Sequence, residues 1–187
     1  MKWTLLIVLL CIAMQNAVGQ EYTEKPVYFD NSPVNIAKDE VKKEFIAPPS
    51  SFSRLKSASA KNAHFEVSYI NFPEEAKIAF EHAVAIWESL LSSDVTIKVQ
   101  ANWEYMEGNL LGKGRPSIFF NNFAGSPLPN VYYPVALVEK LTGKEMNPGS
   151  FDIICNFNSK YSWYFGTDGN TPETKYDLVS SVMHEIA

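Results

Sequence analysis

The chain has 187 residues, of which 46% are hydrophobic, 20% charged and 13% aromatic, and its formal net charge is -5. This composition excludes disordered, collagen-like and disulfide-dense chains, and the length fits one domain better than two. Proteins that bind nucleic acid concentrate Lys and Arg on one surface. Because the charges here are spread along the chain and slightly acidic, we expect no nucleic-acid partner.

The first 19 residues have the features of a secretory signal peptide. Met1-Lys2 is a short positive segment, and residues 3–14 are almost all apolar but too few to cross a bilayer of about 30 Å comfortably. Small residues in Ala17-Val18-Gly19 predict cleavage after Gly19. We therefore expect a secreted or extracellular protein with no stable membrane span after cleavage; an uncleaved N-terminal anchor is the alternative.

Residues 20–62 are polar and interrupted by Pro-Pro and Ser-rich stretches, without a period that buries a face. We interpret them as a leader, a linker or a propeptide, and residues 63–187 as the ordered domain. One cysteine, Cys155, remains after signal cleavage and cannot form an intrachain disulfide. It alternates with polar residues in an apolar-rich run, so we expect it to be a small buried core residue.

Three elements are predicted at the start of the domain. Residues 65–69 alternate as a strand with Phe65, Val67 and Tyr69 on one face. A helix opens at Pro73, with Glu74 and Glu75 at the positive end of its dipole. Residues 95–103 alternate for nine positions and form the clearest strand. The helix carries a core-facing apolar stripe: Ala76, Phe80, Ala83, Val84, Trp87, Leu90 and Leu91.

The second half alternates between loops and short elements. We expect a Gly-bearing loop over 108–116, a short strand over 117–121 and turns over 122–130. Pro134 makes 131–141 an edge segment or a loop with a short helix. A strand over 151–157, a loop over 158–175 and a helix from Asp177 complete the order. The fold class is α+β, with one twisted mixed sheet covered by helices.

The last helix carries the most informative residues. Its apolar positions span an arc of roughly 140°, at 3.6 residues per turn, and His184 falls on the opposite side with Glu185 at its flank. In the motif H-E-x-x-H, two imidazoles one helical turn apart bind zinc and the glutamate acts as general base. Only H-E-I-A is present here. The apolar positions are Leu178, Val179, Val182, Met183 and Ile186.

Residues 176–187, Y-D-L-V-S-S-V-M-H-E-I-A, resemble the active-site helix of metzincin-like secreted zinc metalloproteases. Phe72 to Glu88, followed by Val95 to Val99, is similar to the backing helix and next strand in the N-terminal half of that family's catalytic domain. The resemblance covers about Phe65 to Ala187. It implies an incomplete metzincin-like N-terminal subdomain that ends inside its zinc-binding helix.

The resemblance implies a role for two residues. His184 is the first zinc ligand, and Glu185 is the general base that activates a zinc-bound water to hydrolyse a peptide bond. The substrate is a protein or peptide and the cofactor is zinc, whose second and third ligands are expected beyond Ala187. Because one imidazole cannot make a tetrahedral site, we expect the 187-residue chain itself to be inactive and to bind no zinc tightly.

Two other functions remain open. One is a secreted binding or adhesion module whose aromatic loop, Trp163 to Phe165, holds a ligand; the other is a catalytically dead metzincin-like domain. That aromatic cluster more often closes the core under a long loop. His64 and His82 are expected at the surface rather than at the zinc. The carboxylates of Asp152, Asp168 and Asp177 are too scattered in sequence to predict a calcium site.

Overall fold

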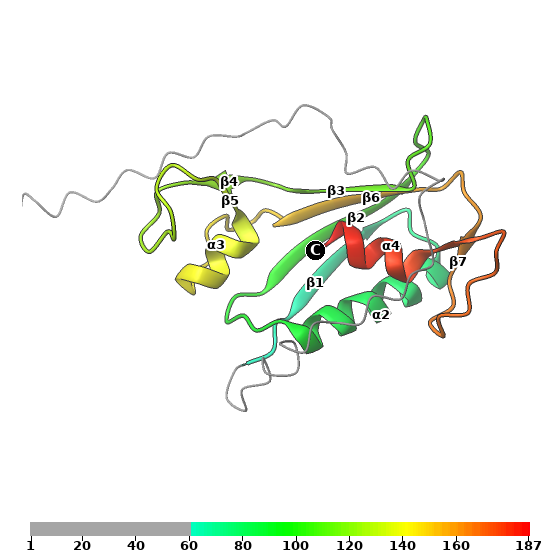
Figure 1. The fold of residues 1–187 in the computed structure, drawn as a ribbon, viewed down its shortest axis with the longest axis horizontal. Coiled ribbons are helices and arrows are strands. Elements are labelled where there is room, and N and C mark those ends of the chain that lie inside the picture. Colours follow the sequence, from blue (N-terminus) through cyan, green and yellow to red (C-terminus); the bar gives the residue numbers. More distant parts are fainter. Residues whose placement is uncertain (1–60) are drawn as a thin grey trace, which may run out of the picture.

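The computed structural model describes residues 61–187, so the predicted signal peptide and almost all of the predicted leader lie outside the described residues. The described part is an α+β structure with a mixed sheet, as predicted (Figure 1). None of its helices is long and apolar enough to cross a bilayer. The elements are β1 (Phe65–Ile70), α2 (Glu74–Leu90), β2 (Ile97–Glu104), β3 (Gly112–Pro116), β4 (Phe119–Phe120), β5 (Tyr133–Pro134), α3 (Val135–Thr142), β6 (Ile153–Asn158), β7 (Trp163–Tyr164), β8 (Tyr176–Asp177) and α4 (Leu178–Glu185).

The main sheet has the strand order β1-β2-β6-β3. The first three strands are parallel, and β3 runs antiparallel to β6 at the edge. Cys155 of β6 is paired with Ala101 of β2 on one side and with Gly114 of β3 on the other. This register brings the glycine-containing edge strand beside the most buried part of the sheet.

Helices α2 and α4 lie on the same face of this sheet (Figure 1). Their packing is reinforced by the Trp87 indole, whose Nε1 donates to the Met183 carbonyl oxygen over 3.2 Å. Phe80 of α2 and Phe157 of β6 meet edge to face, with centroids 5.9 Å apart. The buried core between these layers includes Ala76, Ala79, Phe80, Ala83, Val99, Ala101, Cys155, Phe157, Leu178 and Val182.

The first three predicted elements are present, with shifted ends. Helix α2 stops at Leu90, so Leu91, which was predicted as the end of its apolar stripe, is exposed. Strand β2 begins at Ile97 rather than at Val95. The Ser93 hydroxyl donates to the Val95 carbonyl over 2.7 Å and accepts from the Val95 N–H over 3.2 Å, which holds the backbone of Val95 in a turn.

The prediction of a loop over 108–116 is wrong for its second half. Residues 112–116 form β3, which is five residues long and pairs with β6 from Gly112↔Phe157 to Pro116↔Ile153. Glycine and proline are rare inside strands, and they are tolerated here because β3 is at an edge. The prediction failed because tertiary pairing with β6, which local composition does not encode, overrides the local preference.

Pro134 precedes a short helix, as one of the two alternatives for 131–141 predicted. Helix α3 ends at Gly143, which adopts a left-handed conformation with φ of 65°. This helix packs with β4 and β5 in a second, smaller core beyond the main sheet (Figure 1). That core consists of Phe120, Phe123, Val135 and Val138.

Two further predictions about buried side chains are confirmed. Cys155 is a free, fully buried thiol, and burial raises its pKa. Trp163 belongs to the main core and donates its indole N–H to the Asn158 carbonyl over 2.8 Å. Trp163, the first residue of the aromatic cluster at 163–165, therefore packs in the core under a loop.

Candidate active site

Helix α4 carries the predicted site residues, and one side of the helix is buried against the sheet. Asp177 is its N-cap, and its carboxylate accepts from the Ser180 N–H over 2.6 Å. Leu178 and Val182 are fully buried on the sheet and Ile186 is almost so. This packing fixes the rotation of the helix and therefore the directions of the two residues between Val182 and Ile186.

His184 and Glu185 leave the helix in different directions, since successive residues are about 100° apart. His184 is exposed, as its position opposite the apolar stripe predicts. Glu185 is only 9% exposed, so it lies deeper than a residue on the flank of a solvated face. Both side chains nevertheless line the same cavity.

The Glu185 carboxylate lies between α4 and the edge strand β3. A backbone hydrogen bond from Gly114 favours its ionised form, but burial is the larger effect and raises the pKa of Glu185 to about 7. Its Oε1 atom is buried and has no hydrogen-bond partner among the described residues. A carboxyl group in this state can accept and release a proton near neutral pH, which is the property that a general base requires.

Two glycines of β3 make room for this carboxylate. A Cβ atom built on Gly112 would lie 3.2 Å from Glu185 Oε1, and one built on Gly114 would overlap the Glu185 carbonyl oxygen. Both glycines face α4, since they are two residues apart in a strand. No β-carbon fits at position 114 unless the helix end moves away from the strand.

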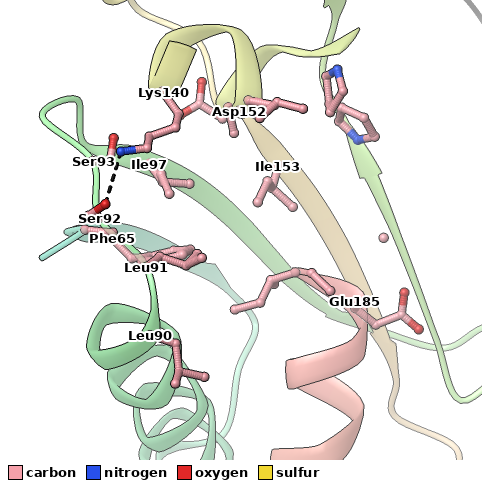
Figure 2. A pocket seen from close by; sticks show the side chains of 18 of the residues that line it. Phe65, Leu90, Leu91, Ser92, Ser93, Ile97, Lys140, Asp152, Ile153 and Glu185 are labelled. Carbon is pink, nitrogen blue, oxygen red and sulfur yellow. Dashed lines mark hydrogen bonds between the residues drawn. The ribbon is translucent and has the colours of Figure 1, made fainter. Parts of the chain in front are cut away.

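The cavity beside Glu185 has a volume of about 1000 Å³ and a mainly apolar lining. Phe65, Ile97 and Ile153 form its floor from three neighbouring strands. Figure 2 shows Glu185 at one end and Lys140 with Asp152 at the other. Lys140 of α3 reaches across to Ser92, with 3.1 Å between Nζ and Oγ. The cavity can therefore accept apolar groups next to a carboxyl and an imidazole.

The other two histidines do not join His184, as predicted. His64 is exposed and its Nδ1 lies 3.2 Å from Oε1 of Glu88, a residue of α2. His82 is exposed on α2 and does not line the cavity. Within residues 61–187, α4 therefore supplies the single imidazole at this cavity.

An acidic cluster that the sequence did not predict lies near the far end of the cavity. Asp152 does not cluster with Asp168 and Asp177, as expected, but the fold brings it close to Glu139 and Glu145. Burial raises the pKa of Glu139 to about 7 and also raises that of Asp152. One signal was available in the sequence: Glu139 shares the buried side of α3 with Val135 and Val138, at the spacing of a core residue.

Comparison with known proteins identifies a family but no activity. A family model described as SPBPB7E8-like matches residues 61–187, which is more than half of the chain. The chain belongs to this family. No curated protein and no solved structure matches it significantly. The family's description names no activity, so the chemistry of its members has to be argued from the residues of the site.

Replacing Gly114 tests the contact between β3 and α4. Gly114→Ala places a methyl group on the Glu185 carbonyl, so we expect the free energy of unfolding to fall by about 1–3 kcal/mol, as in other overpacked sites. Chemical denaturation measures the change. Lys113→Ala is the matched control, because its side chain is exposed on the same strand and should change stability by less than about 0.5 kcal/mol. Equal effects of both substitutions would contradict the close approach.

Replacing Glu185 tests its buried environment. Burial raises the pKa of Glu185 from 4.5 in the unfolded chain to about 7 in the folded chain. Between these two pH values the folded chain binds more protons than the unfolded chain, so its stability falls as the pH rises from about 4.5 to about 7. Glu185→Gln removes this part of the fall. In metal-free buffer we expect the variant to match the parent at pH 4, below both pKa values, and to exceed it by about 3 kcal/mol at pH 8, at 1.36 kcal/mol per pKa unit. Parallel stability profiles for the two proteins would show that Glu185 titrates like a solvated carboxyl.

Proposed function

We propose that this chain carries part of the active site of a secreted zinc-dependent metalloendopeptidase. The observation that supports the proposal is the pairing at the end of α4: an exposed His184 and a buried Glu185 open into one cavity from consecutive positions. The order of strand, helix, strand and final helix agrees with the metzincin-like arrangement that the sequence resembles. The proposal therefore rests on the site and on the order of elements, since the family match carries no chemistry.

The residues present fit one part of a zinc site. His184 is exposed on the cavity and can offer an imidazole nitrogen as the first ligand. Glu185 Oε1 accepts no hydrogen bond from the described residues, so the carboxylate is free to accept a proton from a water beside it. Zinc, when bound, would act as a Lewis acid that lowers the pKa of its water to about 7. Two further ligands would have to come from outside residues 61–187.

Glu185 is the general base in this proposal. Its buried carboxyl group receives the proton of the attacking water and later delivers it to the leaving amine. A pKa of about 7 suits both steps, because at neutral pH the ionised and the protonated forms of the group are both populated, so it can accept a proton and then donate it. The Gly114 N–H donates a hydrogen bond to the Glu185 carboxylate, so β3 helps to hold this general base in position.

The edge position of β3 supports a polypeptide substrate. In the described sheet β3 pairs only with β6, so its other edge is available to an extended segment on either side of Gly114, whose N–H is bonded to Glu185. Peptides commonly bind by adding a strand to such an edge. A substrate paired with β3 would pass Glu185, and the adjoining apolar cavity would accept its side chains. We propose that specificity is for apolar residues next to the cleaved bond.

The alternatives make different use of the same residues. A binding module that uses the 163–165 loop has to do so without Trp163, which is 4% exposed and packed in the core. A catalytically dead domain would keep the fold but lack the remaining zinc ligands. The coding sequence that follows Ala187 separates the readings. A His at position 188, followed by Gly and a further His or Asp at the family spacing, supports the enzyme.

If the coding sequence continues past Ala187, the proposed roles of His184 and Glu185 are tested in that longer chain. We expect about one zinc per chain, and Glu185→Gln to retain the metal but lose nearly all peptide hydrolysis. His184→Ala should lose both. The 187-residue chain is the comparator and should keep no stoichiometric zinc through dialysis. Zinc content by metal analysis and cleavage of a quenched fluorescent peptide library are the measurements; retained hydrolysis in Glu185→Gln would exclude the assigned role.

A further inference from the structure

Three carboxylates converge where α3 and the loop after it meet the start of β6. Glu139 lies in α3, Glu145 in the loop and Asp152 directly before β6. One ligand oxygen of each lies within 4.8 Å of the others. We call these residues the acidic triad. It is distinct from the proposed zinc site and shares no residue with it.

The two inner members of the acidic triad are incompletely hydrogen-bonded. Glu139 is 1% exposed and Asp152 is fully buried. Glu139 Oε1 accepts from the Met146 N–H over 2.8 Å, and Asp152 Oδ2 accepts from the Lys98 N–H over 2.7 Å. The second oxygens, Glu139 Oε2 and Asp152 Oδ1, are buried without a hydrogen-bond partner among the described residues. Buried carboxylate oxygens without a donor are costly, so this pair points to a bound positive species.

The charge around the acidic triad is unbalanced. Lys98 is the cation in contact with it, with 2.5 Å between Nζ and Glu145 Oε2. Lys140, on the same helix as Glu139, turns its Nζ toward Ser92 instead. When all three carboxylates are ionised, one ammonium leaves two negative charges, and buried charges are tolerated only when they are compensated. Burial raises the pKa of Glu139 to about 7, so a proton can compensate one of these charges at neutral pH, and the excess is largest above that pH. A divalent cation supplies the missing charge.

We propose that the acidic triad binds one calcium ion. Carboxylate and amide oxygens are the ligands that calcium prefers, at about 2.3–2.6 Å, so opposite ligands are separated by up to about 5 Å. The ligand oxygens of the triad all lie within 4.8 Å of one another, which this span accommodates. Magnesium demands near-ideal octahedral geometry and usually keeps several waters, so a site made mainly of protein carboxylates favours calcium. Asn147 lies beside Asp152, where its side-chain amide favours the ionised form of the carboxyl group. The exposure of Glu145 provides the entry route from solvent.

Calcium at this place would fasten α3 and its loop to the main sheet. Asp152 is already held there through its backbone, because its N–H donates to the Lys98 carbonyl over 2.8 Å and its carbonyl accepts from Ser117 over 2.9 Å. Glu139 would bind the ion from α3 and so connect this helix to the sheet. Since Asp152 and Lys140 also border the apolar cavity, the ion would stabilise the wall opposite Glu185.

The test is calcium-dependent stability of the 187-residue chain at pH 8, after removal of metals with a chelator. We expect the melting temperature to rise by at least about 3 °C in 10 mM calcium, with a half-maximal effect between about 0.1 and 1 mM. Magnesium should give a smaller rise. Glu139→Gln should abolish the response and Glu145→Gln should weaken calcium binding at least tenfold, measured by equilibrium dialysis with radioactive calcium.

Two controls separate this result from other effects. Glu173→Gln makes the same chemical change at an exposed position outside the triad and should respond like the parent. His184→Ala should keep the full response, so failure of the zinc proposal would leave this one standing. A parent chain that does not respond to calcium, or a response that survives in both Glu139→Gln and Glu145→Gln, overturns the proposal. If Glu139→Gln does not fold, Glu145→Gln decides, because Glu145 is at the surface.

Discussion

The close approach of β3 to the end of α4 is the constraint on which the proposed chemistry depends. Gly114 admits the Glu185 carbonyl where any side chain would collide with it, and Gly112 leaves space for the carboxylate. Antiparallel pairing with β6 holds the strand in that position. Water is thereby excluded from one side of Glu185, and the resulting loss of solvation raises its pKa toward neutrality. Backbone packing and proton affinity are thus coupled at one residue.

The sequence predicted the elements whose signal is local. The alternation of 65–69, the apolar stripe of α2 and the N-cap of α4 are each encoded within one segment, and each is present. The exposed side of α4 followed from the positions of Leu178, Val182 and Ile186, so His184 could be placed correctly. These predictions needed only helical or strand periodicity and the preference of Asp for a helix N-terminus.

The missed features depend on contacts between distant segments. The glycines of β3 are typical of a loop, and they form a strand only because β6, some 40 residues later, provides a partner. The depth of Glu185 followed from that strand and could not be read from α4 alone. Similarly, Asp152 pairs with neither Asp168 nor Asp177, because the turn after α3 brings Glu139 and Glu145 to it instead.

The two acidic centres give the cavity a clear organisation. Glu185 borders one end through α4 and β3, and Asp152 borders the other through the start of β6 (Figure 2). In our account the first centre performs proton transfer, whereas the second holds α3 against the sheet. The apolar floor between them, formed by Phe65, Ile97 and Ile153, contributes shape and apolar contact. Chemistry and rigidity are thus assigned to different carboxylates.

The most direct test of the central claim is the titration of Glu185 itself. Carbon-13 NMR of the glutamate carboxyl groups, with the Glu185 resonance assigned by its loss in Glu185→Gln, measures the pKa of this one group in the metal-free chain. The close contact with β3 predicts a midpoint of about 7. A midpoint near the ordinary value of 4.5 would contradict the account, because it would mean that water reaches the carboxylate and that β3 does not enclose it.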